Sequence, residues 1–149
     1  MKVGKYLRAY GLPLVGLLIF LNVSTAHSET FEFDWESIPI ANLPSKTFQF
    51  GDLVINNCMV SQKPNMMYGN NQVIRVECSA RNGSDKVAIL TLQIFGLDKE
   101  SKITFATSIN PMMGRVVASK VEQMSQNIVD ERTISGTDVV WVRIFGSFK

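Results

Sequence analysis

The sequence predicts an all-β protein, an antiparallel β-sandwich of about seven strands that follows a cleaved signal peptide. Apolar runs of strand length recur from residue 47 onward, and Gly, Asn, Asp and Pro residues separate them. Short strands at such regular intervals are typical of a sandwich. A basic and then apolar segment opens the chain, and two cysteines follow it, as expected of a protein that is exported and oxidised.

Residues 1–26 have the features of a secretory signal peptide in the usual order. The basic region contains Lys2, Lys5 and Arg8. Gly11–Leu21 is apolar, and Ser24-Thr25-Ala26 places small residues where signal peptidase cleaves. A transmembrane anchor is the alternative, but an anchor needs about 20 apolar residues and this run has about 11. We therefore expect a soluble mature protein that begins at His27, is periplasmic or secreted, and has no integral membrane segment.

Removal of this segment changes the net charge. The whole chain has 15 basic and 13 acidic residues and a formal charge of +2. The signal peptide contains three of the basic residues and no acidic one, so the mature chain has 12 basic and 13 acidic residues and a charge of −1. This charge gives no support for a nucleic-acid partner. The roughly 120 mature residues are enough for one domain. We expect an N-terminal arm and connector over 27–46 and the sandwich over 47–149.

Cys58 and Cys78 are predicted to form a disulfide, since an even number of cysteines in an exported chain favours pairing. If residues 53–63 and 72–82 form a hairpin centred on Tyr68, the two cysteines face each other. A bridge across such a loop stabilises a fold by about 3 kcal/mol in the chain-entropy model. The alternatives are two buried free thiols or a redox pair, although the two cysteines lack the C-x-x-C spacing.

The start of the mature chain alternates aromatic and acidic residues. In a regular strand Phe31, Phe33 and Trp35 would share one face, and Glu and Asp residues would share the other. This segment is either the first strand, with its aromatic residues on the core, or an arm that docks on a partner by strand addition. The connector 37–45 contains two prolines, which favours an extended chain over a helix.

The remaining strands follow in order. They are predicted at Thr47–Phe50, Leu53–Ser61, Gln72–Arg81, Val87–Leu97, Lys102–Ile109 and Asp138–Phe148. The 72–81 run alternates apolar and polar residues, which indicates a half-buried strand, whereas the 87–97 run is apolar at almost every position and predicts a strand covered on both faces. Asn82-Gly83 between them predicts a tight hairpin at the centre of the sheet, because both residues tolerate positive φ.

Residues 116–131 are compatible with two structures. Val117, Val121, Met124 and Ile128 have helical spacing, yet the ends of the segment are β-branched and a sandwich needs a strand here. We favour a strand. Ile94-Phe95-Gly96 also recurs as Ile144-Phe145-Gly146. So short a repeat is best explained by similar chemistry at two strand ends.

Two stretches carry a resemblance to a known family. Ala80-Arg81-Asn82-Gly83-Ser84-Asp85-Lys86-Val87 precedes an apolar strand that ends Ile94-Phe95-Gly96-Leu97-Asp98. Together they resemble the FxLYD family of exported immunoglobulin-like domains, over about residues 75–149. Gly96 and Leu97 stand where that family has Leu and Tyr, and its later Pro-Gly turn is missing. The resemblance implies an immunoglobulin-like antiparallel β-sandwich outside the cytoplasm, without catalytic residues.

Most catalytic and metal-binding motifs are missing from the sequence. The one histidine, His27, lies at the expected mature terminus, where it is poorly placed for a catalytic triad. No H-E-x-x-H, P-loop or cysteine-quartet motif is present, and we expect no enzyme and no cofactor. A terminal histidine with the methionine pairs 66–67 and 112–113 could bind copper, but a second histidine is missing. Alternatively, these methionines fill gaps in the core.

The sequence therefore predicts a non-catalytic exported protein that binds or supports another macromolecule in the cell envelope. A protein partner is expected, because aromatic residues are enriched at interface hot spots and methionine is common on adaptable surfaces. The candidate partner-binding residues are Phe31, Phe33, Trp35, Met66, Met67 and Tyr68. The alternatives are a periplasmic copper-binding protein, with His27 as a weak ligand candidate, and a small exported hydrolase.

Overall fold

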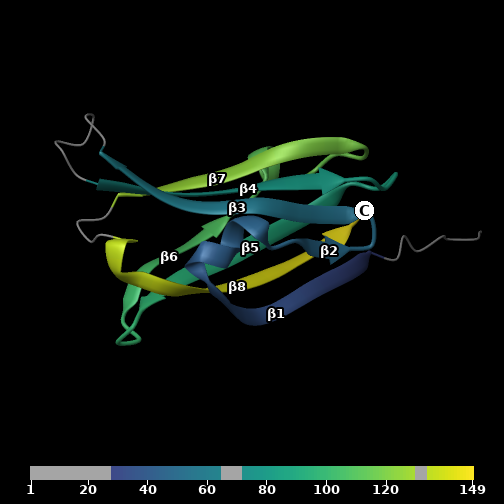
Figure 1. The fold of residues 1–149 in the computed structure, drawn as a ribbon. Helices are drawn as coiled ribbons and strands as arrows, with labels where there is room; N and C mark the ends of the chain where they lie inside the picture. Colours follow the sequence, from purple (N-terminus) through teal and green to yellow (C-terminus); the bar gives the residue numbers. More distant parts are fainter. Residues whose placement is uncertain (1–27, 65–71, 130–133) are drawn as a thin grey trace, which may run out of the picture.

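Two antiparallel four-stranded sheets pack face to face in the computed structural model, which describes residues 28–64, 72–129 and 134–149 (Figure 1). Sheet A has the strand order β1-β8-β5-β6, and sheet B has the order β2-β3-β4-β7. The strands are β1 (Glu29–Pro39), β2 (Phe48–Phe50), β3 (Leu53–Pro64), β4 (Gln72–Asn82), β5 (Ala88–Asp98), β6 (Ile103–Ile109), β7 (Lys120–Val129) and β8 (Thr137–Phe148). Within these described ranges, three short 3-10 helices span Ile40–Ser45, Met112–Gly114 and Ile134–Gly136.

This architecture confirms the predicted all-β antiparallel sandwich. The described residues contain eight strands instead of about seven, because the segment that contains Phe31 and Phe33 is itself a strand. The ambiguous segment 116–131 contributes β7, so the strand alternative was correct. The connector is not extended as predicted, since Ile40–Ser45 forms a 3-10 helix that contains Pro44 and buries Leu43 in the core.

The predicted hairpin at Asn82-Gly83 is wrong, because β4 and β5 lie in different sheets. β4 pairs with β3 and β7, whereas β5 pairs with β6 and β8. Neither Asn82 nor Gly83 has the positive φ that a type I′ turn requires. The side chain of Asn82 is fully buried and organises this crossing between sheets. Its Nδ2 donates to the carbonyl oxygens of Lys86 (2.7 Å) and Val116 (3.1 Å), and its Oδ1 accepts from the backbone N and Oγ of Ser84.

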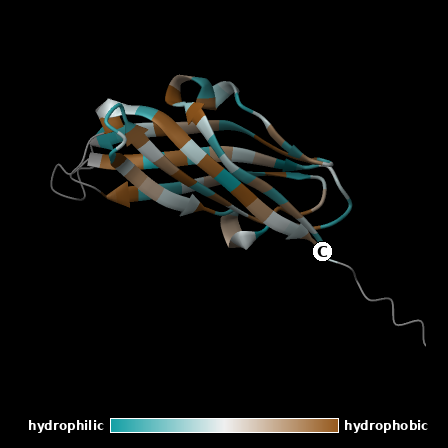
Figure 2. Ribbon diagram, turned by 90° about the horizontal axis from the view of Figure 1, so that it is seen from below, coloured by the Kyte–Doolittle hydropathy of each residue, from teal (hydrophilic) through white to brown (hydrophobic). Residues whose placement is uncertain are grey.

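β5 is also covered on one face only, not on both as its composition predicted. Its inward residues, from Ala88 to Gly96 in alternation, are buried against sheet B. Its outward residues lie on the outer face of sheet A, where the side chain of Ile89 is 37% exposed. Viewed from the side of sheet A, apolar and polar residues alternate along the strands (Figure 2).

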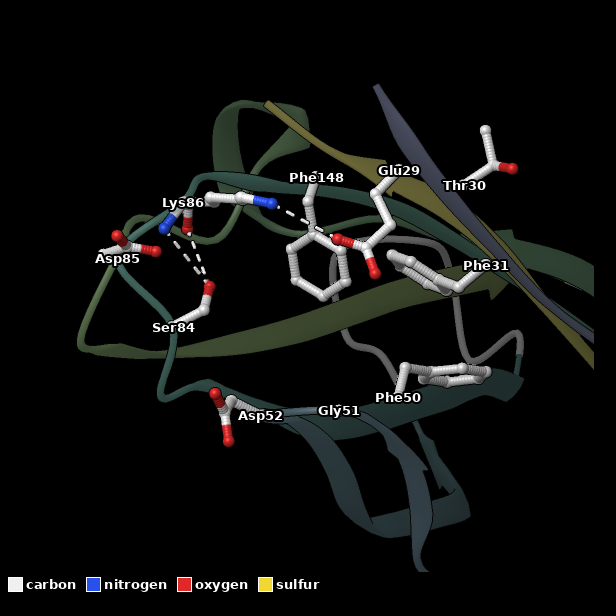
Figure 3. Close-up of a pocket in the computed structure, with 10 residues that line it drawn as sticks. All are labelled: Glu29, Thr30, Phe31, Phe50, Gly51, Asp52, Ser84, Asp85, Lys86 and Phe148. Carbon is white, nitrogen blue, oxygen red and sulfur yellow. Dashed lines mark hydrogen bonds and ion pairs between the residues drawn. The ribbon is translucent and has the colours of Figure 1, made fainter. Parts of the chain in front are cut away.

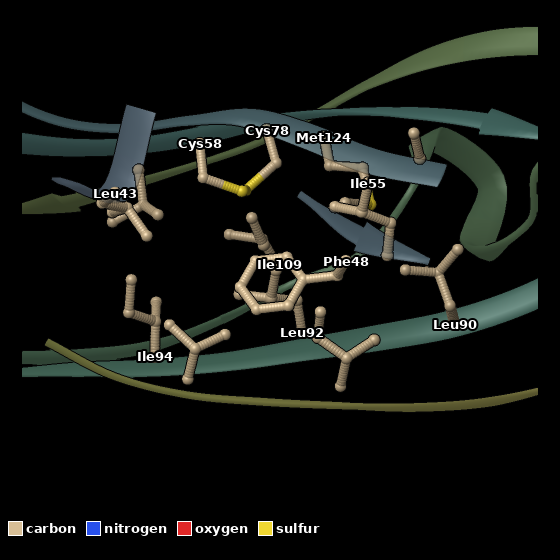
Figure 4. Close-up of a cluster of buried hydrophobic side chains, with 14 of the residues drawn as sticks. Leu43, Phe48, Ile55, Cys58, Cys78, Leu90, Leu92, Ile94, Ile109 and Met124 are labelled. Carbon is tan, nitrogen blue, oxygen red and sulfur yellow. A yellow bond between two sulfur atoms is a disulfide. The ribbon is translucent and has the colours of Figure 1, made fainter. Parts of the chain in front are cut away.

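The predicted disulfide is present in the core (Figure 4). Cys58 and Cys78 lie on the paired strands β3 and β4, with their Cα atoms 4.1 Å apart. From Met59–Glu77 to Pro64–Gln72, the register of these strands is the predicted one, centred on residue 68. A bulge between Asn56 and Met59 shifts the other half of the pairing by one residue. The cysteines face inward beside Met124, Ile55 and the residues of sheet A that complete the core.

The first and last of the described strands lie side by side, since β1 pairs with β8 along its length. Phe31 and Phe33 pack against the core, with ring centroids 4.7 Å from Phe50 and 5.1 Å from Phe48 respectively. This is the arrangement expected of a first strand. β1 is an edge strand, and its bulge and acidic residues are features that discourage pairing with further chains.

The repeated Ile-Phe-Gly sequence has a common packing role at its glycine. Gly96 pairs across strands with Phe105, and Gly146 pairs with Phe31. In both places the ring occupies the space of the missing side chain: a Cβ at Gly146 would lie 2.6 Å from Phe31 Cζ, and a Cβ at Gly96 would collide with the Phe105 ring. The repeat therefore reflects two equivalent aromatic-over-glycine contacts, as expected from chemistry shared by two strands.

Candidate functional site

Three aromatic side chains form a row across the outer face of sheet A. Trp35, Trp141 and Phe95 come from β1, β8 and β5, which are neighbours in that order. The Trp35 and Phe95 ring centroids are 5.1 Å apart at 59°, and the Phe95 and Trp141 rings are nearly parallel with centroids 6.2 Å apart. We call these three residues the aromatic row. Trp35 is 38% exposed and the other two rings are half-buried.

A β-bulge explains why Trp35 belongs to this face. Phe33 pairs with Ile144 and Glu36 pairs with Val142, so Asp34 and Trp35 together lie opposite a single residue of β8. The extra residue reverses the alternation of side chains. Phe31 and Phe33 therefore point into the core, whereas Trp35 lies on the outside and reaches across β8 to Phe95. The predicted common face of Phe31, Phe33 and Trp35 is thus split by the bulge.

A hollow of about 350 Å³ lies beside the aromatic row, over β5 and β6. Its lining includes Trp35, Gln93, Phe95, Ala106 and Ser108. The register explains the hollow, because Ala106 lies opposite Phe95 and Ser108 lies opposite Gln93. Small side chains on the edge strand thus face large ones on β5. The result is a depression with aromatic walls and an amide and a hydroxyl at its rim.

The nearest charges on this face belong to an ion pair. Arg143 lies opposite Gln93 on β8, and its Nε donates to Oε1 of Glu32 at 3.1 Å. The guanidinium also lies 5.4 Å from the centre of the Phe145 ring. The positive charge is therefore balanced by a carboxylate. The lining of the hollow presents aromatic, amide and hydroxyl groups, and none of its described residues is charged.

A second concavity, the end cleft, opens between the two sheets near the C-terminus of the chain (Figure 3). It has a volume of about 340 Å³, and the rings of Phe31, Phe50 and Phe148 lie around it. Its acidic rim residues are Glu29, Asp52 and Asp85, and Lys86 and Ser84 are its other polar side chains.

Some of the polar side chains of the end cleft have partners within the fold. Lys86 Nζ lies 3.2 Å from Glu29 Oε2, and Ser84 Oγ donates to Asn82 Oδ1 at 2.7 Å. The Phe31 ring contacts both other rings, with its centroid 4.7 Å from that of Phe50 and 5.2 Å from that of Phe148. These contacts are what the end of a sandwich needs for its own stability. We therefore take the aromatic row and its hollow as the candidate site.

The remaining candidate residues from the sequence lie elsewhere or outside the described part of the chain. Met66, Met67, Tyr68 and His27 lie outside the described residues, and so does the signal peptide. Of the methionines considered for copper, Met112 and Met113 do not fill the core, since they are 78% and 82% exposed. Among the described residues, no group of three or more His, Cys, Asp or Glu side chains is placed to hold a metal ion. The same part of the chain contains no helix with the length and apolarity to cross a membrane.

Sequence reasoning missed most of the candidate site. It named Trp35 but not Phe95, Trp141, Gln93, Ala106 or Ser108. The available signal is the excess of apolar residues in β5, which by itself predicts burial on both faces. In a two-layer sandwich, each sheet has only one inner face. The same excess could have been interpreted as an apolar outer face.

Comparison with known proteins yields no relative: no protein-family model matches the chain, and neither a curated protein nor a solved structure matches it.

Proposed function

We propose that this chain is an exported, non-catalytic binding module that engages another macromolecule of the cell envelope through the outer face of sheet A. The aromatic row is the observation that supports this proposal. Trp and other large aromatic residues are enriched where binding energy concentrates, and contiguous apolar surface on a soluble domain often marks an interaction site. The fold is complete without any layer that covers the aromatic row, because the core lies between the two sheets.

The remaining features of the chain support export and binding. Its first 26 residues resemble a signal peptide, and its two cysteines form a disulfide, which persists in oxidising compartments. Because both sulfurs are in the bridge, neither cysteine is available as a thiolate nucleophile. In this proposal the mature protein begins at His27 and is periplasmic or secreted. Intact-mass measurement on the native protein tests this processing, and residues 1–26 retained in a membrane fraction would contradict it.

Affinity capture with matched surface variants tests the binding role. The mature protein is immobilised and exposed to the native envelope fraction, beside the double variant Trp35→Ala/Phe95→Ala. The control is Val121→Ala/Val129→Ala, which removes two side chains that are 57% and 48% exposed on β7 of sheet B. We expect the control to capture the same material as the wild type and the ring variant to lose it.

Thermal unfolding of each variant must accompany the capture, so that loss of binding is separated from loss of fold. A folded ring variant that captures the same material as the wild type would refute this use of the outer face of sheet A. Compositional analysis of the captured material, for protein and for sugar, identifies the class of the partner.

A further inference from the structure

The hollow beside the aromatic row is a shallow depression that is wide open to solvent. Two rings at 59° to each other form a corner, and Ala106 leaves the space opposite Phe95 open. Its volume is about 350 Å³. Ligand-binding sites combine apolar surface with a few polar groups that fix the orientation of the ligand. Gln93 and Ser108 are those groups here.

The chemistry of the lining restricts the ligand. None of the described residues that line the hollow is charged, and the neighbouring Arg143 is paired with Glu32. A nucleic acid or other polyanion would need unpaired basic side chains along its backbone. A purely apolar side chain would remove the Gln93 amide and the Ser108 hydroxyl from water without replacing their hydrogen bonds, which is unfavourable. These groups favour an uncharged ligand with a flat apolar face and hydrogen-bonding groups around its edge.

We propose that the hollow binds an uncharged oligosaccharide, one sugar ring of which stacks its C–H face in the corner of Trp35 and Phe95. The hydroxyls of that sugar then exchange hydrogen bonds with Gln93 and Ser108, and Trp141 extends the stacking surface to the next sugar along the row. This inference rests on the proposed function, since it names the class of ligand for the same face.

Intrinsic fluorescence reports on this site directly, because the two tryptophans of the chain, Trp35 and Trp141, both belong to the row. The mature protein is titrated with cellohexaose, chitohexaose, maltohexaose and mannohexaose as uncharged probes. We expect at least one probe to give a saturable change in emission. Fluorescence of the variants is complemented by calorimetry, which does not depend on a tryptophan.

Two kinds of variant locate the binding. Phe95→Ala removes one wall of the corner and should weaken binding roughly tenfold or more, the effect expected at an aromatic hot spot. Ala106→Phe removes no side-chain atom and adds a ring at an exposed position in the hollow, so it should abolish binding while the protein stays folded. Its control is Ser125→Phe, the same gain of bulk at an exposed position of the edge strand β7. This control should bind as the wild type does.

Two outcomes overturn the inference. One is the absence of saturable binding by every probe up to roughly 10 mM, a range in which affinity is already negligible. The other is binding that Ala106→Phe leaves unchanged. If the envelope capture is ring-dependent but retains only protein, and no probe binds, the sugar inference fails while the proposed function stands. If neither assay depends on the rings, both fail.

Discussion

Replacement of Asn82 tests whether one buried amide determines the crossing from sheet B to sheet A. Asn82→Ala removes four hydrogen bonds, to Lys86, Val116 and twice to Ser84. At about 1 kcal/mol each, the loss would be about 4 kcal/mol. The Val116 oxygen retains its bond from Ala88 N, and Ser84 and Lys86 lie near solvent, so water and remaining partners offset part of the loss. We expect the free energy of unfolding to fall by about 2–3 kcal/mol.

Urea unfolding under non-reducing conditions measures this change through the midpoint at constant slope. At roughly 4 °C per kcal/mol for a domain of this size, the melting temperature should fall by about 8–12 °C. The control is Asn127→Ala, which changes an exposed residue of β7 and should stay within about 0.5 kcal/mol of the wild type. An Asn82→Ala variant that loses less than about 1 kcal/mol, or no more than the control, would refute the assigned role of the amide.

Asn82→Asp separates the donor from the acceptor. It retains an oxygen for Ser84 but turns a second oxygen toward the carbonyls of Lys86 and Val116. Burial and these carbonyls raise the pKa of the introduced carboxyl above its value in the unfolded chain. Because the folded state then binds the proton more tightly, stability is lost as the pH rises above the unfolded value of about 3.9. We expect this variant to be less stable than Asn82→Ala at pH 7 and to recover toward pH 4. If the difference in stability between Asn82→Asp and Asn82→Ala did not change with pH, the assigned donor role of the Asn82 amide nitrogen would be contradicted.

Three further outcomes are expected. Gly146→Ala should destabilise by about 1–3 kcal/mol or more, because its Cβ would collide with the Ile89 backbone oxygen, whereas Gly136→Ala meets no atom nearer than 3.9 Å and should be neutral in the same thermal scan. Reduction of the disulfide should cost about 3 kcal/mol, seen as a lower melting temperature, and two thiols that titrate in the native, non-reduced protein would contradict the bridge. Deletion of residues 27–36 removes most of β1 with the partly buried Phe31 and Phe33 and should strongly destabilise the domain, since loss of a fully buried Phe costs about 3–5 kcal/mol and each of these rings contributes part of that; a stable truncated protein would favour an arm instead of a strand.

Sequence patterns predicted the fold where the determining contacts are local, or where two cysteines mark the register. The β3–β4 pairing follows from the position of Cys58 and Cys78 about a common centre, and the structure retains that register up to a bulge. The hairpin prediction at Asn82-Gly83 was wrong because the determining contact is not local. The geometry of this segment depends on a hydrogen bond from Asn82 to Val116, 34 residues away, which no local pattern reveals. The same sequence signal is compatible with a tight hairpin and with a corner between sheets.

The sequence named Trp35 but placed it on the wrong face of its strand, because of a single inserted residue. Regular alternation places Trp35 with Phe31 and Phe33, and only the bulge in β1 moves it to the outer face. The partners of Trp35 come from strands that are distant in sequence and adjacent only in the sheet. A hollow that depends on Ala106 opposite Phe95 likewise requires the register of β5 and β6 to be known.

The aromatic row could also serve the fold, since Trp35 connects β1 to β5 across β8, and the two roles make different demands on the sheet. If the contact between Trp35 and Phe95 served only to hold β1 on the sheet, polar side chains would be expected to cover it, because exposed aromatic surface increases the risk of association. Instead Trp35 remains 38% exposed, and Ala106 and Ser108 leave the Phe95 side of the row open. Larger residues at these two positions would cover the rings at little cost on an edge strand that favours bulky side chains. The small residues therefore preserve access to the rings, which stability alone does not require and which ligand binding does.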